Sequence, residues 1–316
     1  MISTRNWSFL PLNGVLFVIL AAVWGTSFVA IEVGLEHFPP LLFAALRYAV
    51  AGAIVLGYAT LTTDRWRPVT RDDWTAVGVV GAFVIAGYHG LLYLGELHVP
   101  GAIAAVIVSL SPVLTAVFAS AFLADERLGP VEVAGLAFGL LGVVVVAAPD
   151  PAALVGSTLL GVALVFLGGA CFALGSVLTR PIDSGLPLRS LEGWGMLVGA
   201  GLLFAAGDVR GESMAAIDWS APAVASLAYL TIVSGVLAFL LYFDLLDRMG
   251  PTEINLVGYL EPVVAAVMSW LLLGHLIDGT TLLGFGIIFF GFALVKRDAV
   301  FTLAGGATDA VAGDGR

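Results

Sequence analysis

Two stretches of the chain share one pattern, and that pattern decides the fold. The first is SLSPVLTAVFASAFLADERLGPVEVAGLAFGLLGVVVV (Ser109–Val146), and the second is YLEPVVAAVMSWLLLGHLIDGTTLLGFGIIFFGFALV (Tyr259–Val295). In each, an apolar run with a proline near its middle, Pro112 or Pro262, leads through a short polar turn into a second, glycine-spaced apolar run. The chain therefore consists of two related halves.

The composition around these stretches is that of a membrane protein. Of 316 residues, 60% are hydrophobic and only 11% are charged, whereas soluble domains use about 25% charged residues. A water-soluble globule could not hide so much apolar surface, which excludes a cytosolic enzyme and a secreted domain. The single cysteine, Cys171, lies in an apolar run and is expected to pack as a small hydrophobe.

Continuous apolar runs predict membrane-spanning helices rather than barrel strands, because barrel strands alternate apolar and polar residues. A bilayer core of about 30 Å needs about 20 apolar residues in a helix. A window of that length predicts ten spans, at residues 12–32, 40–61, 74–95, 101–123, 131–148, 158–178, 189–207, 222–246, 252–273 and 278–296.

The distribution of cations predicts how these spans are oriented. With ten spans, eleven Lys and Arg residues share one side of the membrane with both termini, Arg210 lies on the other side, and Arg47 lies within a span. Because positive residues collect in cytoplasmic loops, both termini are expected to be cytoplasmic.

The repeat and the span count together predict the domain organisation. We expect one five-helix repeat in residues 1–150, a second in residues 151–297, and a disordered acidic cytoplasmic tail in residues 298–316. Since five is odd, the second repeat enters the membrane from the opposite side. Inverted repeats are the architecture of alternating-access transporters.

Four short motifs carry a resemblance to a known family. They are the run Trp24–Phe28 (WGTSF), Arg47, the run Ser109–Pro112 (SLSP), and Glu126 with Gly135. Together they resemble the EamA family of the drug/metabolite transporter superfamily, over residues 12–296. The resemblance implies a ten-helix carrier with a central substrate cavity, often a metabolite exporter. The chain departs from the family at His275, where the second repeat commonly has a glutamate.

Several other functions are excluded by missing features. No Walker A loop exists, and the only lysine, Lys296, lies at the end of the last apolar run, where it could not hold a retinal. Twelve arginines against one lysine, with a net charge of −10, argue against nucleic-acid binding. The four histidines are too scattered for a metal site, so we expect neither a metal nor a cofactor.

The two prolines mark the predicted substrate cavity. Each removes a backbone donor, which frees the carbonyl of Val108 or Gly258 and tends to kink its helix. A kink buffered by neighbouring helices is one interpretation; paired breaks at a binding site are the other. Three polar residues on the same two helices, Ser109, Ser111 and Asn255, are added as cavity candidates.

Glu261 and Arg47 are the deep charges of the predicted bundle. An ionised side chain at that depth costs at least about 2.5 kcal/mol, so each needs a partner, water or neutralisation. One hypothesis pairs them with each other. The rival hypothesis has Glu261 titrate and couple proton movement to transport, while Arg47 faces an anionic substrate group or a neighbouring carbonyl.

Aromatic and histidine residues complete the candidates. Trp24, Tyr88 and Tyr259 could line the cavity, and His89 is either a hydrogen-bonded packing residue or a titrating one. Helix capping or solvation explains three acids at span ends, Glu32, Glu192 and Glu253. Two more, Asp125 and Glu126, are expected to end their span, with gating as a weaker alternative.

The sequence thus predicts a secondary transporter, not an enzyme, that exports a small metabolite or drug by alternating access, with proton coupling through Glu261 as one of the two hypotheses for that residue. It would work as a monomer or a homodimer in the cell membrane. A passive channel is an alternative. An intramembrane hydrolase that used Ser27 with His89 is a remote one, because no second motif supports it.

Overall fold

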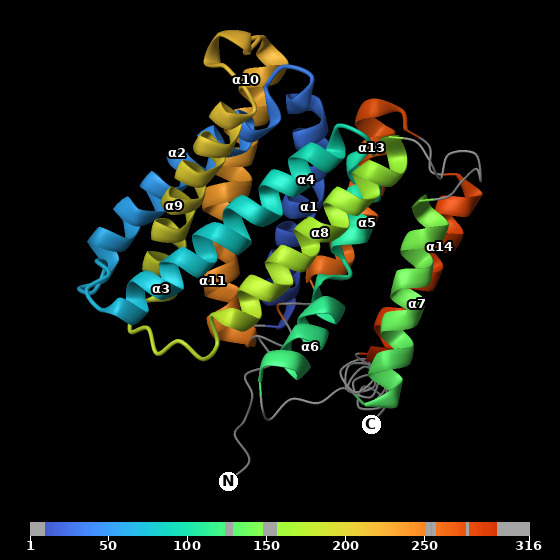
Figure 1. Cartoon of the computed structure of the whole chain (residues 1–316), viewed down its shortest axis with the longest axis horizontal. Helices are drawn as coiled ribbons and strands as arrows, with labels where there is room; N and C mark the ends of the chain where they lie inside the picture. The colour runs from blue at the N-terminus through green and yellow to red at the C-terminus, as the bar shows by residue number, and fades with distance from the viewer. Residues whose placement is uncertain are drawn as a thin grey trace.

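The computed structural model describes residues 10–123, 129–147, 157–250, 254, 257–275 and 278–295, which form helices joined by turns, with no strand among them. Before residue 150 the helices are α1 (Leu10–Leu35), α2 (Pro40–Thr62), α3 (Arg71–Val79), the π-helical η2 (Val80–Gly87), α4 (Tyr88–Glu96), α5 (Gly101–Val108), α6 (Ser111–Phe122) and α7 (Pro130–Ala147). After it they are α8 (Ser157–Leu178), α9 (Leu188–Val209), the short η4 (Met214–Ala216), α10 (Ala221–Ala228), the π-helical η5 (Tyr229–Leu237), α11 (Ala238–Met249), α13 (Val257–Leu273) and α14 (Gly279–Val295). Figure 1 shows them as one bundle, with α7 and α14 side by side along one edge.

The predicted all-helical membrane fold is confirmed, and a helix occupies each of the ten predicted segments. Among the described residues, seven helical segments are long and apolar enough to cross a membrane: Leu12–Leu35, Pro40–Thr62, Arg71–Glu96, Gly101–Phe122, Thr158–Leu178, Leu188–Val209 and Ala221–Met249. Three further apolar helices are shorter, Val133–Val146, Val257–Leu273 and Gly279–Gly291. The count of ten spans and the side of the termini therefore stay predictions.

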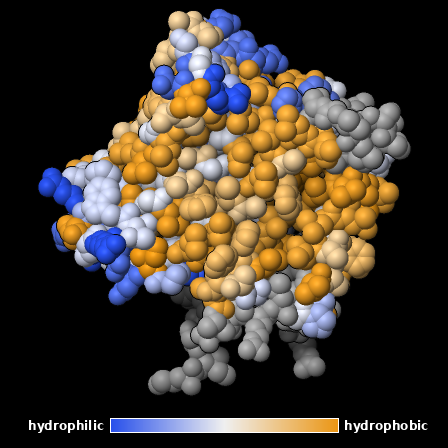
Figure 2. Space-filling view, in the orientation of Figure 1, coloured by the Kyte–Doolittle hydropathy of each residue, from blue (hydrophilic) through white to orange (hydrophobic). Residues whose placement is uncertain are grey.

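The surface of the bundle agrees with a lipid environment. Figure 2 shows apolar residues over most of one face, while polar residues gather at the top, near α10, and at the lower left, near the start of α3. Large side chains such as Leu61, Val144 and Leu271 are more than half exposed. Such exposure is unfavourable in water and costs nothing against lipid tails.

Small residues let the most closely packed helix pairs approach. A Cβ added to Gly52 of α2 would lie 2.8 Å from the Met196 Cβ of α9. A Cβ added to Gly142 of α7 would lie 2.8 Å from the Gly284 carbonyl oxygen of α14. Glycine at these two contacts brings α2 against α9 and α7 against α14, which explains part of the high glycine content.

Two long helices contain a π-helical turn at corresponding places in the two halves, η2 and η5. Each ends near a glycine that lies so close to the carbonyl oxygen five residues earlier that a side chain would crowd it. A Cβ on Gly87 would lie 3.0 Å from the Ala82 oxygen, and one on Gly235 would lie 2.9 Å from the Leu230 oxygen. Residues 74–95 and 222–246 were predicted as uninterrupted helices, without these wider turns, which are common at functional sites.

Candidate functional site

Arg47 lies at the centre of the bundle, in α2, with 4% of its surface exposed. Its guanidinium donates three hydrogen bonds: from Nε to the Leu230 carbonyl oxygen at 3.1 Å, from Nη1 to the Tyr93 hydroxyl at 3.0 Å, and from Nη2 to the Ser234 hydroxyl at 3.2 Å. The Tyr48 ring lies below it, 4.8 Å from Cζ. We call these five residues the Arg47 cluster. In the part of the chain that the structure describes, this cation is held by neutral groups.

The π-helical turn η5 supplies the acceptors of the Arg47 cluster. Leu230 and Ser234 both lie in η5, whereas Arg47 and Tyr93 come from α2 and α4 in the other half of the chain. The Ser27 hydroxyl of α1 lies 2.8 Å from the Ser234 hydroxyl, and the Trp24 ring nitrogen donates to the Ser234 carbonyl oxygen at 3.4 Å. The two halves thus meet through one buried hydrogen-bond network.

The hypothesis that Arg47 pairs with Glu261 does not match this geometry. Arg47 faces α4 and η5, so its bonds go to a carbonyl, as the rival hypothesis allowed, and to two hydroxyls. In the described part of the chain no ion pair joins it to Glu261. Glu261 lies half-buried in α13, within electrostatic range of Tyr88, which in turn lies within range of Arg47. Tyr88 therefore lies within electrostatic range of both charges.

His89 is held as a hydrogen-bonded packing residue. Its Nε2 bonds the Tyr48 hydroxyl, and its Nδ1 lies 3.2 Å from the Ile85 carbonyl oxygen in η2. The Tyr48 and Tyr88 ring centroids lie 4.5 and 4.3 Å from that of His89. The ring thus joins Tyr88 to the Arg47 cluster through Tyr48.

Ser27 and His89 do not form a nucleophile and base. Ser27 bonds Ser234 and the Val23 carbonyl oxygen, while both ring nitrogens of His89 have other partners. A hydrolytic site needs its base within hydrogen-bond reach of the nucleophile. This geometry removes the basis of the hydrolase alternative.

The two proline helices differ in structure. The first is interrupted at Ser109 and Leu110, between α5 and α6, and the Ser111 hydroxyl donates to the freed Val108 carbonyl oxygen at 2.7 Å. The Ser109 hydroxyl donates to the Val106 carbonyl oxygen at 2.6 Å. Both serine hydroxyls therefore bond carbonyl oxygens of their own helical segment, next to Pro112.

The second proline helix continues through its proline. Pro262 is buried inside α13, with Glu261 and Tyr259 half-buried on the same helix. The candidates Asn255, Glu126 and Glu253 lie outside the described residues. The predicted kink is thus seen as a break in the first helix only.

Comparison with known proteins identifies the family. The model of the EamA-like transporter family matches residues 12–148 and again residues 159–297. The chain belongs to this family. It is a multi-pass cell membrane transporter, not an enzyme.

Relatives of this EamA-like transporter carry transporter names. The uncharacterized inner membrane transporter YedA of Escherichia coli K12 is 29% identical, over 90% of each chain. A probable amino-acid metabolite efflux pump of Salmonella typhimurium is 27% identical, over 88% of this chain and 93% of its own. One crystal structure has the same fold, with a TM-score of 0.64 and 21% identity over 92% of this chain and 99% of that chain.

Two buried carboxyl groups of the transporter were missed by the sequence analysis. Glu96 is 6% exposed, and neither of its carboxyl oxygens has a hydrogen-bond partner among the described residues. It ends α4, one residue beyond the predicted span. Glu192 was assigned to a capped or solvated span end, which is wrong: it lies inside α9, and its Oε2 is buried without a partner in the described part of the chain.

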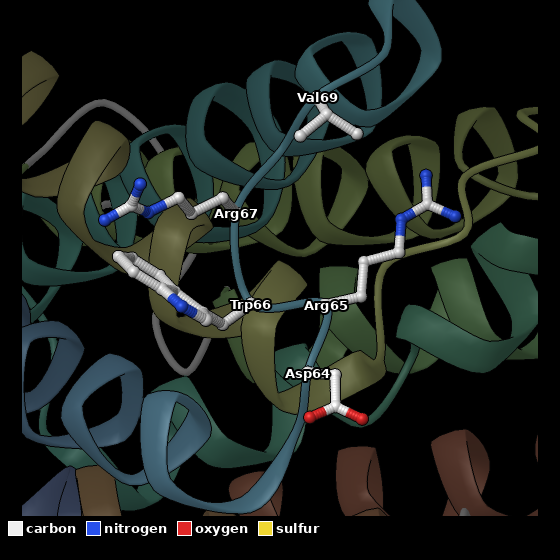
Figure 3. A pocket seen from close by; sticks show the side chains of 5 residues that line it. All are labelled: Asp64, Arg65, Trp66, Arg67 and Val69. Carbon is white, nitrogen blue, oxygen red and sulfur yellow. The ribbon is translucent and has the colours of Figure 1, made fainter.

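A surface hollow of about 350 Å³ lies away from the Arg47 cluster, at the turn before α3. Figure 3 shows its lining residues, with Arg65 and Arg67 extending to opposite sides of the turn. The Arg67 Cζ lies 4.2 Å from the centroid of the Trp66 ring, and the Trp66 carbonyl oxygen accepts a bond from Trp194 of α9 at 2.9 Å. A tryptophan with flanking arginines is typical of a membrane-interface anchor, so we do not assign the hollow to the substrate.

Proposed function

We propose that this transporter exports a small metabolite by alternating access between two inverted five-helix repeats, with both termini in the cytoplasm. The substrate binds near the Arg47 cluster, where the repeats meet. The protein acts as a monomer or a homodimer. The observation that carries the proposal is a buried arginine, held by neutral groups from both halves, that has no carboxylate partner in the described structure.

The two-repeat organisation has three supports. The family model matches the chain twice, once on each side of residue 150. The π-helical turns η2 and η5 lie at corresponding places in the two matches. Arg47 of α2 bonds α4 in its own half and η5 in the other half. Rocking of one half against the other would therefore change the arginine's partners. A carrier needs such a site at its midplane.

The charges define the class of substrate. A buried cation is costly unless it is paired, and a guanidinium has five N–H donors, of which three are used here. The remaining donors suit a carboxylate. Glu261, the half-buried acid of α13, suits an ammonium group. We therefore propose an amino-acid-like metabolite, in agreement with the name of the Salmonella typhimurium relative.

The transport proposal is tested by counterflow in proteoliposomes that contain the purified full chain. Radiolabelled L-amino acids serve as probes, against an excess of each unlabelled amino acid inside. Saturable accumulation is expected, since a carrier exchanges its substrate, whereas a channel only equilibrates it. No accumulation with any carboxylate-bearing probe would overturn the substrate class, and flux without counterflow would favour the channel.

Arg47→Gln keeps a planar donor group and removes the charge. A charge-assisted hydrogen bond contributes about 1.5–3 kcal/mol, so counterflow should fall about tenfold or more. Arg248→Gln makes the same change at an exposed arginine, paired with Asp244 at 2.8 Å, and should leave counterflow unchanged. Equal loss in both variants would remove the assigned role of Arg47.

We further propose that Glu261 couples transport to proton movement. Glu261→Gln should abolish uptake driven by a pH difference, because an amide cannot release a proton. Exchange at equal pH should remain but need a higher substrate concentration, because the ammonium group loses its charged partner. Unchanged pH dependence in the vesicles would remove the role of Glu261.

A further inference from the structure

A second group of titratable side chains lies at the end of the bundle where α1, α4 and α13 terminate, toward the top of Figure 1. It consists of Glu32 of α1, Glu96 of α4 and His275 in the turn after α13. The His275 Nδ1 lies 3.2 Å from the Glu32 Oε1, and Glu96 lies within electrostatic range of Glu32. We call these three residues the Glu96 cluster.

Two contacts hold the Glu32 side chain in place. Its Oε2 accepts a hydrogen bond at 2.9 Å from the backbone N–H of Gly101, the first residue of α5. The N-terminus of a helix carries partial positive charge and stabilises an anion. His275, with 49% of its side chain exposed, adds a donor on the other oxygen.

The surroundings of Glu96 favour a neutral carboxyl. It is the last residue of α4, and the C-terminus of a helix carries partial negative charge, which opposes a second negative charge there. Both of its oxygens are buried and unpartnered among the described residues. An unpaired buried carboxylate beside another carboxylate is strongly unfavourable, so a bound proton is the simplest way to keep Glu96 in place.

Charged and titratable groups act on Glu96 from several neighbouring elements. Glu32 of α1 and Arg47 of α2 both interact electrostatically with Glu96. The hydrogen bonds of Arg47 go to the Arg47 cluster. Tyr88 and Tyr93, on the same helix as Glu96, lie within electrostatic range of its carboxyl group. His98, in the following turn, packs beside Gly161 of α8. The elements α5, α8 and η2 carry no charged residue.

We propose that Glu96 is a proton-binding residue that, with Glu32 and His275, forms a proton-operated seal at this end of the transporter. The proposal deepens the proposed transport function and rests on it. When Glu96 is neutral, the ends of α1, α4 and α5 pack against one another and the seal is closed. When Glu96 loses its proton, that proton passes to water. One proton has then left the protein, and two carboxylates repel each other.

Infrared difference spectra of the detergent-purified full chain test the bound proton without any substrate. A step from low to high pH should remove the absorption of a protonated carboxylic acid. Glu96→Gln should lack that component, whereas Glu36→Gln, the same change at an exposed glutamate one turn beyond Glu32, should keep it. An unaltered band in Glu96→Gln would overturn the proposal.

Hydrogen–deuterium exchange tests the seal in the same samples. After correction for the intrinsic pH effect, backbone exchange in residues 97–103 should rise about tenfold at high pH in the unaltered chain, since charge repulsion of about 1.4 kcal/mol gives that factor. The rise should disappear in Glu96→Gln and shrink in Glu32→Gln, where the opposing charge is removed. The same rise in all three proteins would overturn the seal.

These measurements separate the two proposals. A pH-dependent band and exchange without counterflow would support the seal and reject the proposed transport of amino-acid-like substrates. Counterflow without either signal would support transport and reject the seal.

Discussion

Two buried carboxyl groups lie at opposite ends of the same long helical segment, Arg71–Glu96, and they have opposite surroundings. Asp73 is fully buried and accepts bonds from Arg65, from the backbone N–H groups of Val69 and Thr70, and from Ser184, all at 3.0 Å. Glu96 is almost as buried and accepts none among the described residues. Burial of an acid alone therefore says little about its role. The donors around it distinguish a structural carboxylate from one that exchanges a proton.

Asp73 ties two connections of the bundle together. Its side chain accepts from the Thr70 N–H while the Thr70 hydroxyl accepts from the Asp73 N–H at 3.0 Å, which makes a capping box at the start of α3. Ser184, in the turn before α9, reaches the same carboxylate. The turns before α3 and before α9 are thereby fixed to each other.

The largest expected effect is that of Asp73→Asn. The amide would place a donor among four donors and leave several of them unsatisfied in a buried site, so the free energy of unfolding should fall by about 2–4 kcal/mol. Thermal unfolding in detergent, followed by circular dichroism, measures the loss. Asp72→Asn, at the exposed neighbouring position, should change stability by less than about 0.5 kcal/mol. Similar losses in both variants would show that the buried donors do not matter.

Ser184→Ala should cost about 1 kcal/mol, because it removes one neutral donor and leaves Asp73 with three others. The double variant with Asp73→Asn tests whether the two residues act together. Residues in one hydrogen-bond network are not additive, so the combined loss should be smaller than the sum of the single losses. Strict additivity would mean that the Ser184 bond does not stabilise the turn.

The fold was largely predictable, because long apolar runs can satisfy backbone groups in lipid only as helices. Part of the site was predictable too. Arg47 stood out as the one cation deep within a predicted span. Its partners Leu230 and Ser234 were not predictable, since they lie more than 180 residues away in a π-helical turn whose sequence resembles any apolar helix.

The buried acids were hidden for a related reason. Hydropathy gives the end of an apolar run but not the direction of the last side chain. Glu96 therefore fell one residue outside the predicted span, and Glu192 was assigned to a capped or solvated end. His275 was noted only as a departure from the family. Its contact with Glu32 joins segments more than 240 residues apart, which one sequence cannot show.

Asp278 offers an exposed counterpart to these buried acids. Two hydrogen bonds from Thr281, from its N–H at 2.8 Å and its hydroxyl at 3.1 Å, hold the pKa of Asp278 below its usual value. Asp278 caps α14, so Asp278→Ala should cost about 0.5–1 kcal/mol at neutral pH. Because the pKa is lowered by folding, this stability is present above the ordinary pKa and is lost as pH falls through the lowered one.

Stability curves of the unaltered chain and the Ala variant should therefore converge in acid, as measured by unfolding at a series of pH values. Asp278→Asn keeps an acceptor that does not titrate, so its stability should not show this pH dependence. A gap between the unaltered chain and the Ala variant that stays constant into acid would contradict the capping role.

Glu96→Gln should have the smallest effect on stability, less than about 0.5 kcal/mol at neutral pH, although Glu96 is buried as deeply as groups whose replacement costs several times more. If Glu96 carries a proton in the folded chain, the variant exchanges one neutral planar group for another of the same shape and breaks no hydrogen bond. Unfolding of this variant beside Asp73→Asn compares the two ends of one helix directly. A loss as large as that of Asp73→Asn would mean that Glu96 is an anion held by donors, and the distinction between the two carboxyl groups would fail.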